Sequence, residues 1–343
     1  MTLFRPAAQL VALVLGLSLA APAGAQEVTL RLHQFLPEQS FVPAHILTPW
    51  ADAIEAGSNG RIKIERYPAM QLGGKPADLV DQLVDGVVDI IWTLPGYTPG
   101  RFPRTEVFEL PFLVADAEAA SAAYWDLAQT EMKDTDFKDL HLLGAWVHGR
   151  GVIHSSRPVL KVEDLAGLKL RAPSRTTTML LEQLGAIPVG MPVPAVPEAL
   201  SKGVIDGALL PWEVSASLKV GELVHNHTEF PGKGIYVATF ILAMNKDSYD
   251  RLPDDLKAVI DAASGAAFSA EAGRLQQAED IPARKAAEDL GNAIVTLSPD
   301  EAARWEAAAA PVTQSWIAEV AAAGIDGQAL LDSARAAIAA HSR

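Results

Sequence analysis

Two segments of the chain carry the same pattern, and this internal repeat constrains the fold more than any other feature. Each segment has a helix-forming run, a glycine that ends it, two β-branched residues and an aspartate, as in PADLVDQLVDGVVDIIW and PAVPEALSKGVIDGALL. Gly86 corresponds to Gly203 and Asp89 to Asp206, at equal separations along the chain. A repeated helix-glycine-strand unit predicts two similar α/β lobes that face one another. Chance recurrence of a common plan is the alternative.

The stretch before the second copy predicts a place where an anion could bind. Leu168 to Arg171 alternate apolar and basic residues as a short strand does, and Pro173 ends that strand. Ser174 is a good N-cap for a helix that runs to Leu184. Arg171 is therefore expected at the carboxyl end of a strand, beside a helix N-terminus, where open α/β sheets bind ligands. The local pattern leaves open a surface arginine on an edge strand.

The repeat also nominates residues at the facing edges of the two lobes. A few positions after the repeated aspartates stand Trp92 and Thr93 in the first lobe, and Leu210, Pro211 and Trp212 in the second. We expect their side chains to lie near the cleft, because ligands bind outside the carboxyl ends of the strands.

Connections between the lobes are expected at three places. The segment that begins at His141 reads as a strand that crosses between the lobes, with Arg150 near the crossing. The later strand YVATFILAMN would return to the first lobe. A long helical tract then runs from Pro253 towards Leu290, with a kink expected at Pro282.

The first 25 residues read as an export signal. Arg5 precedes an apolar run, and Ala23, Gly24 and Ala25 form a cleavage site of small residues. The mature protein is expected to begin near Gln26 and to lie in the periplasm. No later run is long and apolar enough to span a bilayer, so we expect no stable membrane insertion.

Residue types and charge argue against several other classes of protein. The chain has no cysteine, which excludes disulfides, thiol catalysis and cysteine metal sites. Its formal net charge of −14 argues against nucleic acid as a partner. No GxSxG, HExxH or phosphate-binding loop is present, so we expect no enzyme, although a hydrolase with scattered catalytic residues stays open. His225 and His227 lack a third ligand nearby, so we expect neither a metal nor a cofactor.

Several motifs together resemble the extracytoplasmic solute-binding proteins of tripartite ATP-independent periplasmic (TRAP) transporters, the DctP-like family. They are GLKLRAP, LGAIPVGMPV and EALSKGVIDG, with MQLGG, GVVDI and ELPFL in the first lobe. The resemblance implies an α/β fold of the two-lobed, type II-like periplasmic binding proteins, with cross-over strands and a long hinge-spanning helix. On this basis lobe I comprises residues 26–149 and about 237–275, and lobe II residues 150–236 and about 276–343. It further implies a small organic carboxylate as ligand, handed to membrane permease subunits that an ion gradient drives.

The resemblance assigns roles to individual residues. Arg171 stands where the family has an arginine that clamps the carboxylate. Arg150 stands where many members have a second arginine, although its spacing to Arg171 is one residue longer than in the sialic-acid branch. Where that branch has a ligand-binding asparagine this chain has Leu210, and Val193 replaces a cleft phenylalanine.

The first lobe is expected to contribute its own cleft residues. Gln34 and Phe35 stand at the cleft edge of the first strand, and His33 could donate to or accept from a phenolic hydroxyl, or be structural. The ligand-binding residues expected from sequence are Arg171, Arg150, Trp212, Leu210, Trp92, Thr93, Gln34, Phe35, His33 and Val193.

This expected lining favours an aromatic or otherwise hydrophobic monocarboxylate, such as a benzoate or hydroxybenzoate. A polyhydroxylated acid would need many buried partners, and each unpaired group costs about 1 to 3 kcal/mol. An aliphatic keto or hydroxy acid or a sugar acid on the same clamp is the alternative ligand, and a sensor for a membrane kinase is the alternative role. Glu213 could balance the arginine or contact a metal, as an acidic residue does in some keto-acid-binding relatives.

Overall fold

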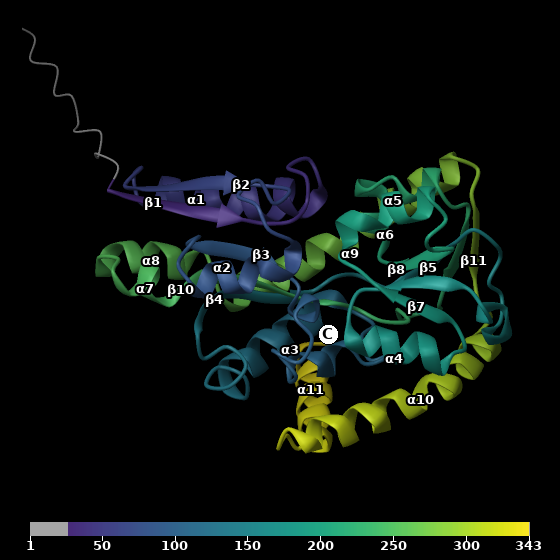
Figure 1. Ribbon diagram of the computed structural model, residues 1–343. Coiled ribbons are helices and arrows are strands. Elements are labelled where there is room, and N and C mark those ends of the chain that lie inside the picture. The colour runs from purple at the N-terminus through teal and green to yellow at the C-terminus, as the bar shows by residue number, and fades with distance from the viewer. Residues whose placement is uncertain (1–26, 343) are drawn as a thin grey trace, which may run out of the picture.

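The molecule contains two β-sheets, one in each lobe (Figure 1). The computed structural model describes residues 27–342, so the expected export signal lies outside the described residues. The five-stranded sheet has the order β2 (Ile62–Tyr67), β1 (Val28–His33), β3 (Ile90–Thr93), β10 (Thr239–Asn245) and β4 (Leu140–Val147). The six-stranded sheet has the order β11 (Ala293–Thr296), β9 (Asn226–Glu229), β5 (Val152–Ser155), β8 (Gly207–Leu210), β6 (Lys169–Ala172) and β7 (Ile187–Gly190). The expected α/β fold with two lobes is confirmed.

The internal repeat has the same geometry in both lobes. In the first sheet the Asp89 carboxylate accepts from the backbone N–H of Arg31 at 2.9 Å, just before β1 pairs with β3. In the second sheet the Asp206 carboxylate accepts from the backbone N–H of Lys169 at 2.9 Å, just before β6 pairs with β8. The repeated glycines that end the preceding helices have φ of 70° and 66°, a region that favours glycine. Each aspartate therefore locks the start of a parallel strand pair.

Helices cover both sheets. They are α1 (Thr48–Gly57), α2 (Leu79–Val84), α3 (Ala117–Thr130), α4 (Arg175–Gln183), α5 (Val196–Ser201), α6 (Trp212–Ser217), α7 (Lys246–Asp250), α8 (Asp254–Ala262), α9 (Ala266–Asp289), α10 (Pro299–Ala322) and α11 (Gly327–His341). The helical tract that the sequence predicts as one unit from Pro253 is two helices, because the chain turns at Gly265, whose φ is +88°. Pro282 lies inside α9.

The three connections between the lobes that the sequence predicts are all present. The chain crosses from β4 to β5 and returns from β9 to β10. The long helix α9 packs against α3 and β4 on the first-sheet side and against α6 on the second-sheet side. Side chains of α9 are therefore available to a cavity between the lobes.

The C-terminal helices do not stay with one lobe. Helix α10 packs along α4, and α11 packs against α3 on the first-sheet side (Figure 1). The indole of Trp316 donates to Glu106 at 3.0 Å, which ties α10 to the first lobe as well. The expected assignment of all of residues 276–343 to lobe II therefore does not describe α11, whose alanine-rich face gave no sign of its partner.

Candidate functional site

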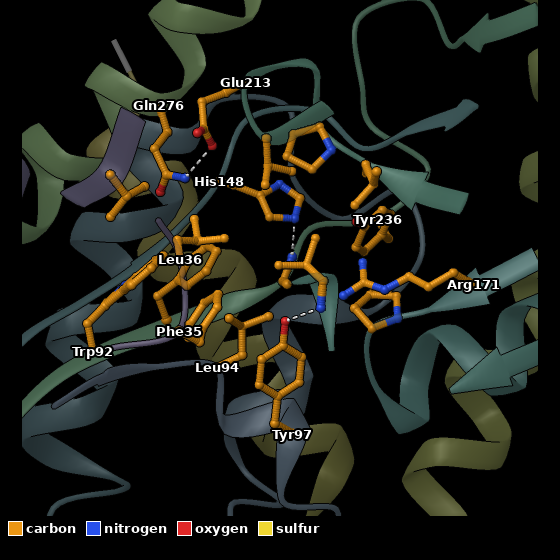
Figure 2. Close-up of a pocket in the computed structure, with 18 residues that line it drawn as sticks. Phe35, Leu36, Trp92, Leu94, Tyr97, His148, Arg171, Glu213, Tyr236 and Gln276 are labelled. Carbon is orange, nitrogen blue, oxygen red and sulfur yellow. Dashed lines mark hydrogen bonds between the residues drawn. The ribbon is translucent and has the colours of Figure 1, made fainter. Parts of the chain in front are cut away.

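A cavity lies between the two sheets and takes its lining from both lobes and from α9. Its empty volume is about 380 Å³, in the range of small-molecule sites. Five of the ten residues expected from sequence line it: Phe35, Trp92, Arg171, Val193 and Leu210. Figure 2 shows Arg171 entering from one side, with Phe35 and Trp92 across the cavity.

Local sequence explains why Arg171 reaches this place. Strand β6 ends at Ala172, because Pro173 cannot continue the ladder. Ser174 caps α4, and the backbone N–H of Ser174 donates to Thr177 Oγ1 at 2.9 Å, which closes a reciprocal cap. The strand end and the helix start therefore leave Arg171 pointing towards the space between the lobes.

The Arg171 guanidinium is held in place but not fully satisfied. Its Nε donates to the Met191 carbonyl at 3.0 Å, and its Nη1 donates to the Leu209 carbonyl at 3.0 Å. The side chain is 2 % exposed, and Nη2 has no hydrogen-bond partner. No carboxylate among residues 27–342 forms an ion pair with it. A buried, unpaired cation with a free donor requires an anion, because the desolvated charge is otherwise uncompensated.

Two tyrosines flank the guanidinium. The Tyr97 hydroxyl accepts from the backbone N–H of Val193 at 2.9 Å, and the Tyr236 hydroxyl donates to the Leu209 carbonyl at 3.0 Å. Burial raises the pKa of Tyr97, and the nearby positive charge of Arg171 offsets part of that rise. Tyr97 comes from the first lobe and Val193 from the second, so their hydrogen bond closes one side of the cavity.

Stacked aromatic rings form the wall opposite Arg171. The rings of Phe35 and Trp92 lie 4.5 Å apart at 18°, and Trp92 and Phe240 lie 5.4 Å apart at 20°. Leu36, Val42, Leu94 and Val214 complete the apolar part of the lining. A flat apolar group would find extensive contact here.

His148 also lines the cavity, but both of its ring nitrogens are already used. Its Nδ1 contacts the Gly149 carbonyl at 2.6 Å, and its Nε2 accepts from the backbone N–H of Ala238 at 2.9 Å. These partners fix a neutral ring with the proton on Nδ1. Burial lowers the pKa of His148 to about 4, so it contributes no positive charge near neutral pH.

A polar pair lies away from Arg171. The Gln276 amide nitrogen donates to the Glu213 carboxyl at 3.1 Å, and both side chains line the cavity. Burial, with a smaller contribution from the neighbouring Glu279 carboxylate, raises the pKa of Glu213 to about 7. In Figure 2 this pair and the Arg171 guanidinium occupy opposite sides of the cavity.

The structure keeps three expected first-lobe residues away from the cavity. Both ring nitrogens of His33 have partners, Gln82 at 2.8 Å and the backbone N–H of Leu72 at 3.4 Å. The Gln34 amide folds back on Leu36, whose carbonyl accepts from it at 2.7 Å. Thr93 follows Trp92 in β3, so its side chain points to the other face of the sheet.

Two expected second-lobe residues also lie elsewhere. Arg150 is exposed, and its Nε donates to the Ala115 carbonyl at 3.2 Å. Trp212 begins helix α6, where the strand alternation stops, and its indole donates to Glu229 at 2.7 Å.

Sequence reasoning did not select five polar lining residues as ligand contacts: Tyr97, His148, Glu213, Tyr236 and Gln276. Tyr97 lies in a turn-rich segment, and Gln276 lies within the polar pattern of a long helix. Their positions depend on how the lobes meet, which no local pattern reveals. The crossing between the lobes was the one usable signal, because His148 lies on one cross-over segment and Tyr236 on the other.

The histidines form no metal centre in the part of the chain that the structure describes. His227 and His154 contact each other through their Nδ1 atoms at 2.8 Å, and His225 contacts Asn292 at 3.0 Å. In the same residues, no helix is both long and apolar enough to cross a bilayer.

Known proteins resemble this chain in sequence and in fold. The model of bacterial extracellular solute-binding protein, family 7, matches residues 34–319. A TRAP solute-binding protein from Rhodoferax ferrireducens, solved with copurified benzoate, is 52% identical, covers 91% of this chain and 98% of its own, and has a TM-score of 0.89. A marine metagenome TRAP solute-binding protein specific for aromatic acid ligands, solved with 3-hydroxybenzoate, is 45% identical over 93% of this chain and 100% of its own, with a TM-score of 0.91.

A dicarboxylate-binding protein is also similar to this chain. The C4-dicarboxylate-binding periplasmic protein of Rhodobacter capsulatus is 26% identical over 88% of this chain and 90% of its own. These matches confirm the resemblance that the sequence motifs predict, and they identify a binding protein rather than an enzyme. The chain therefore belongs to family 7 of the bacterial extracellular solute-binding proteins, the DctP family that serves TRAP transporters.

Proposed function

We propose that this protein binds an aromatic monocarboxylate, of the benzoate or hydroxybenzoate class, and delivers it to the membrane subunits of a TRAP permease. The observation that carries the proposal is the unpartnered Nη2 of buried Arg171, which faces a cavity walled by Phe35, Trp92 and Phe240. The carboxylate would pair with Arg171, and the ring would lie against the aromatic wall.

The binding free energies involved favour a ligand that is largely apolar. A charge-assisted hydrogen bond contributes about 1.5 to 3 kcal/mol, whereas micromolar binding requires about 8 kcal/mol. Burial of apolar surface, at about 25 cal/mol per Å², is the other source of binding free energy that this lining offers. The ligands of the two related structures, benzoate and 3-hydroxybenzoate, support the same class.

Ligand binding would stabilise the closed arrangement of the lobes. Arg171 lies on the second lobe, whereas Phe35 and Trp92 lie on the first, so one ligand touches both lobes only when they are closed. A ligand that binds the closed state better shifts the population towards it. Small-angle scattering should therefore report a smaller radius of gyration with ligand, and an unchanged radius would contradict closure.

A thermal-shift screen tests the ligand class. The protein from Gln26 onward would be heated with benzoate, hydroxybenzoates, keto acids, aliphatic hydroxy acids and sugar acids. Aromatic acids should raise the melting temperature, because a ligand bound only to the native state stabilises it. A rise with sugar acids or keto acids alone would replace the aromatic class with the alternative one.

Export and delivery are tested separately. We propose cleavage near Ala25 and release into the periplasm, which N-terminal sequencing of the periplasmic protein would check. Uptake of labelled ligand into vesicles that contain the partner permease subunits would support delivery. Ligand-dependent activation of a membrane kinase, without uptake, would instead assign the protein to sensing.

A further inference from the structure

We infer that Glu213 and Gln276 form a second polar subsite, which binds a hydroxyl group on the ligand ring at the side opposite Arg171. The inference deepens the proposed function and rests on it, because it concerns the same cavity and the same class of aromatic acid. Glu213 comes from α6 of the second lobe, and Gln276 comes from the long helix α9.

Hydrogen-bond accounting fixes the orientation of Gln276. The indole N–H of Trp146, which can only donate, contacts the Gln276 carbonyl oxygen at 2.7 Å. The amide nitrogen of Gln276 must therefore face Glu213, where it donates at 3.1 Å. The amide cannot flip without leaving the indole facing another donor.

The second neighbour of Glu213 is also a donor. Ser217 Oγ accepts from the backbone N–H of Phe41 at 3.3 Å, so its own proton is free for the Glu213 carboxyl, 3.5 Å away. Both side-chain partners of Glu213 therefore donate to it. When the carboxyl is protonated, Ser217 Oγ is the one acceptor that these contacts offer its O–H, at the long distance of 3.5 Å, and a ligand hydroxyl in the cavity would offer a closer one.

Charge around Glu213 selects against a second anion. Glu279 raises its pKa, and the Asp280 carboxylate already accepts from the backbone N–H of Glu213 at 2.9 Å. Among residues 27–342, no basic side chain forms an ion pair with Glu213. A second carboxylate on the ligand would meet this acidic cluster, whereas a neutral hydroxyl both donates and accepts and satisfies Glu213 in either protonation state.

Placement within the cavity indicates where the hydroxyl lies on the ring. Arg171 and the Glu213–Gln276 pair lie on opposite sides of the cavity, and the His148 ring is drawn between them in the view of Figure 2. With the carboxylate at Arg171, a hydroxyl meta or para to it points towards Glu213. An ortho hydroxyl stays beside the carboxylate and does not reach the pair.

Titration calorimetry with benzoate and the three monohydroxybenzoates tests the subsite. The measured quantity is the ratio of two Kd values in the same variant, benzoate over hydroxybenzoate. For the unmodified protein we expect a ratio of about ten or more for the meta or para isomer, and no preference for the ortho isomer. In Glu213→Leu the ratio should fall to about one. Glu213→Gln, which keeps a donor and an acceptor and nearly the same shape, should retain an intermediate ratio.

The outcomes separate the subsite from the proposed function. A meta or para ratio near one in the unmodified protein, or a high ratio that survives Glu213→Leu, overturns the subsite while aromatic-acid binding stands. Failure of all four acids to bind overturns the proposed function and the subsite with it. If Glu213→Leu fails to fold, which thermal unfolding without ligand would reveal, Glu213→Gln decides: an unchanged ratio there overturns the subsite.

Discussion

Strands β1 and β6 occupy equivalent places in the two lobes, and each places a basic side chain at the same position of its parallel pair. His33 pairs with Ile91 across the first sheet, and Arg171 pairs with Ala208 across the second. The two differ in what they leave unsatisfied. Both nitrogens of His33 have protein partners, whereas Nη2 of Arg171 has none. Equivalent positions therefore do not imply equivalent roles, and an unmatched buried donor is the better sign of a ligand contact.

Loss of the arginine should have the largest effect. Arg171→Ala removes the guanidinium, whose Nη2 has no protein partner, and we expect the free energy of benzoate binding to weaken by about 2 to 3 kcal/mol, roughly 30-fold to 150-fold in affinity. Arg171→Lys should recover little, because an ammonium cannot reproduce the fork that also holds Met191 and Leu209. Calorimetry on both variants measures this.

Arg150→Ala is the matched control, because Arg150 is exposed and lies outside the cavity lining. The affinity of the Arg150→Ala variant for benzoate should stay within about twofold of that of the unmodified protein, a difference of about 0.4 kcal/mol in binding free energy. An equal loss in both arginine variants would show that overall positive charge, rather than the fixed guanidinium, attracts the ligand.

His33→Ala should show the opposite behaviour to Arg171→Ala. Removing the imidazole leaves Gln82 and the backbone N–H of Leu72 without their buried partner, so stability should fall by about 1 to 3 kcal/mol. Ligand affinity should hardly change, because His33 does not line the cavity. Urea unfolding measures the stability and calorimetry on the same sample measures the affinity. A loss of affinity without a loss of stability would show that His33 acts in ligand binding rather than in the fold.

Gly96 tests whether the two lobes must close. A Cβ at Gly96, in the first lobe, would lie 2.7 Å from the Ser174 Cβ in the second. Gly96→Ala should therefore disfavour the closed state and weaken ligand binding by about 1 kcal/mol, roughly fivefold, with little effect on unfolding because an open form relieves the clash. Gly190→Ala is the control, because nothing lies within 4 Å of its Cβ. Equal affinities in the two variants would argue against closure.

The smallest expected effect is a difference in pH dependence. Burial lowers the pKa of His33 below its ordinary value, so between these two values the unfolded chain binds more protons than the native one. Stability from this group is therefore present above the ordinary pKa of about 6.5 and is lost as pH falls below it. His33→Gln should lose less stability than the unmodified protein between pH 7 and pH 5 in urea titrations. If the stabilities of the two proteins fall in parallel as pH is lowered, His33 contributes nothing to the loss of stability in acid.

The fold could be predicted from sequence because its signals are local and repeated. The glycine and aspartate of each copy mark a helix end and a strand start, and both copies have the same hydrogen bond from the aspartate. The break at Gly265 and the return of α11 to the first lobe were missed, because alanine-rich helices carry little information about their partners.

Five of the ten residues expected from sequence line the cavity, for a related reason. Arg171, Trp92 and Leu210 lie at or next to strand ends, whose place in an α/β sheet follows from the topology. Trp212 lies outside the lining because a helix begins there and the side-chain alternation of β8 ends. Tyr97 reaches the cavity only through the meeting of two lobes, which a single segment cannot encode.

A crystal structure of the protein with bound benzoate tests the central claim most directly. We expect the ligand carboxylate to lie within about 3 Å of Arg171 Nη2, the usual distance for a charge-assisted bond, with the ring against Phe35 and Trp92. A carboxylate bound elsewhere, with Nη2 still unpartnered, would contradict the account.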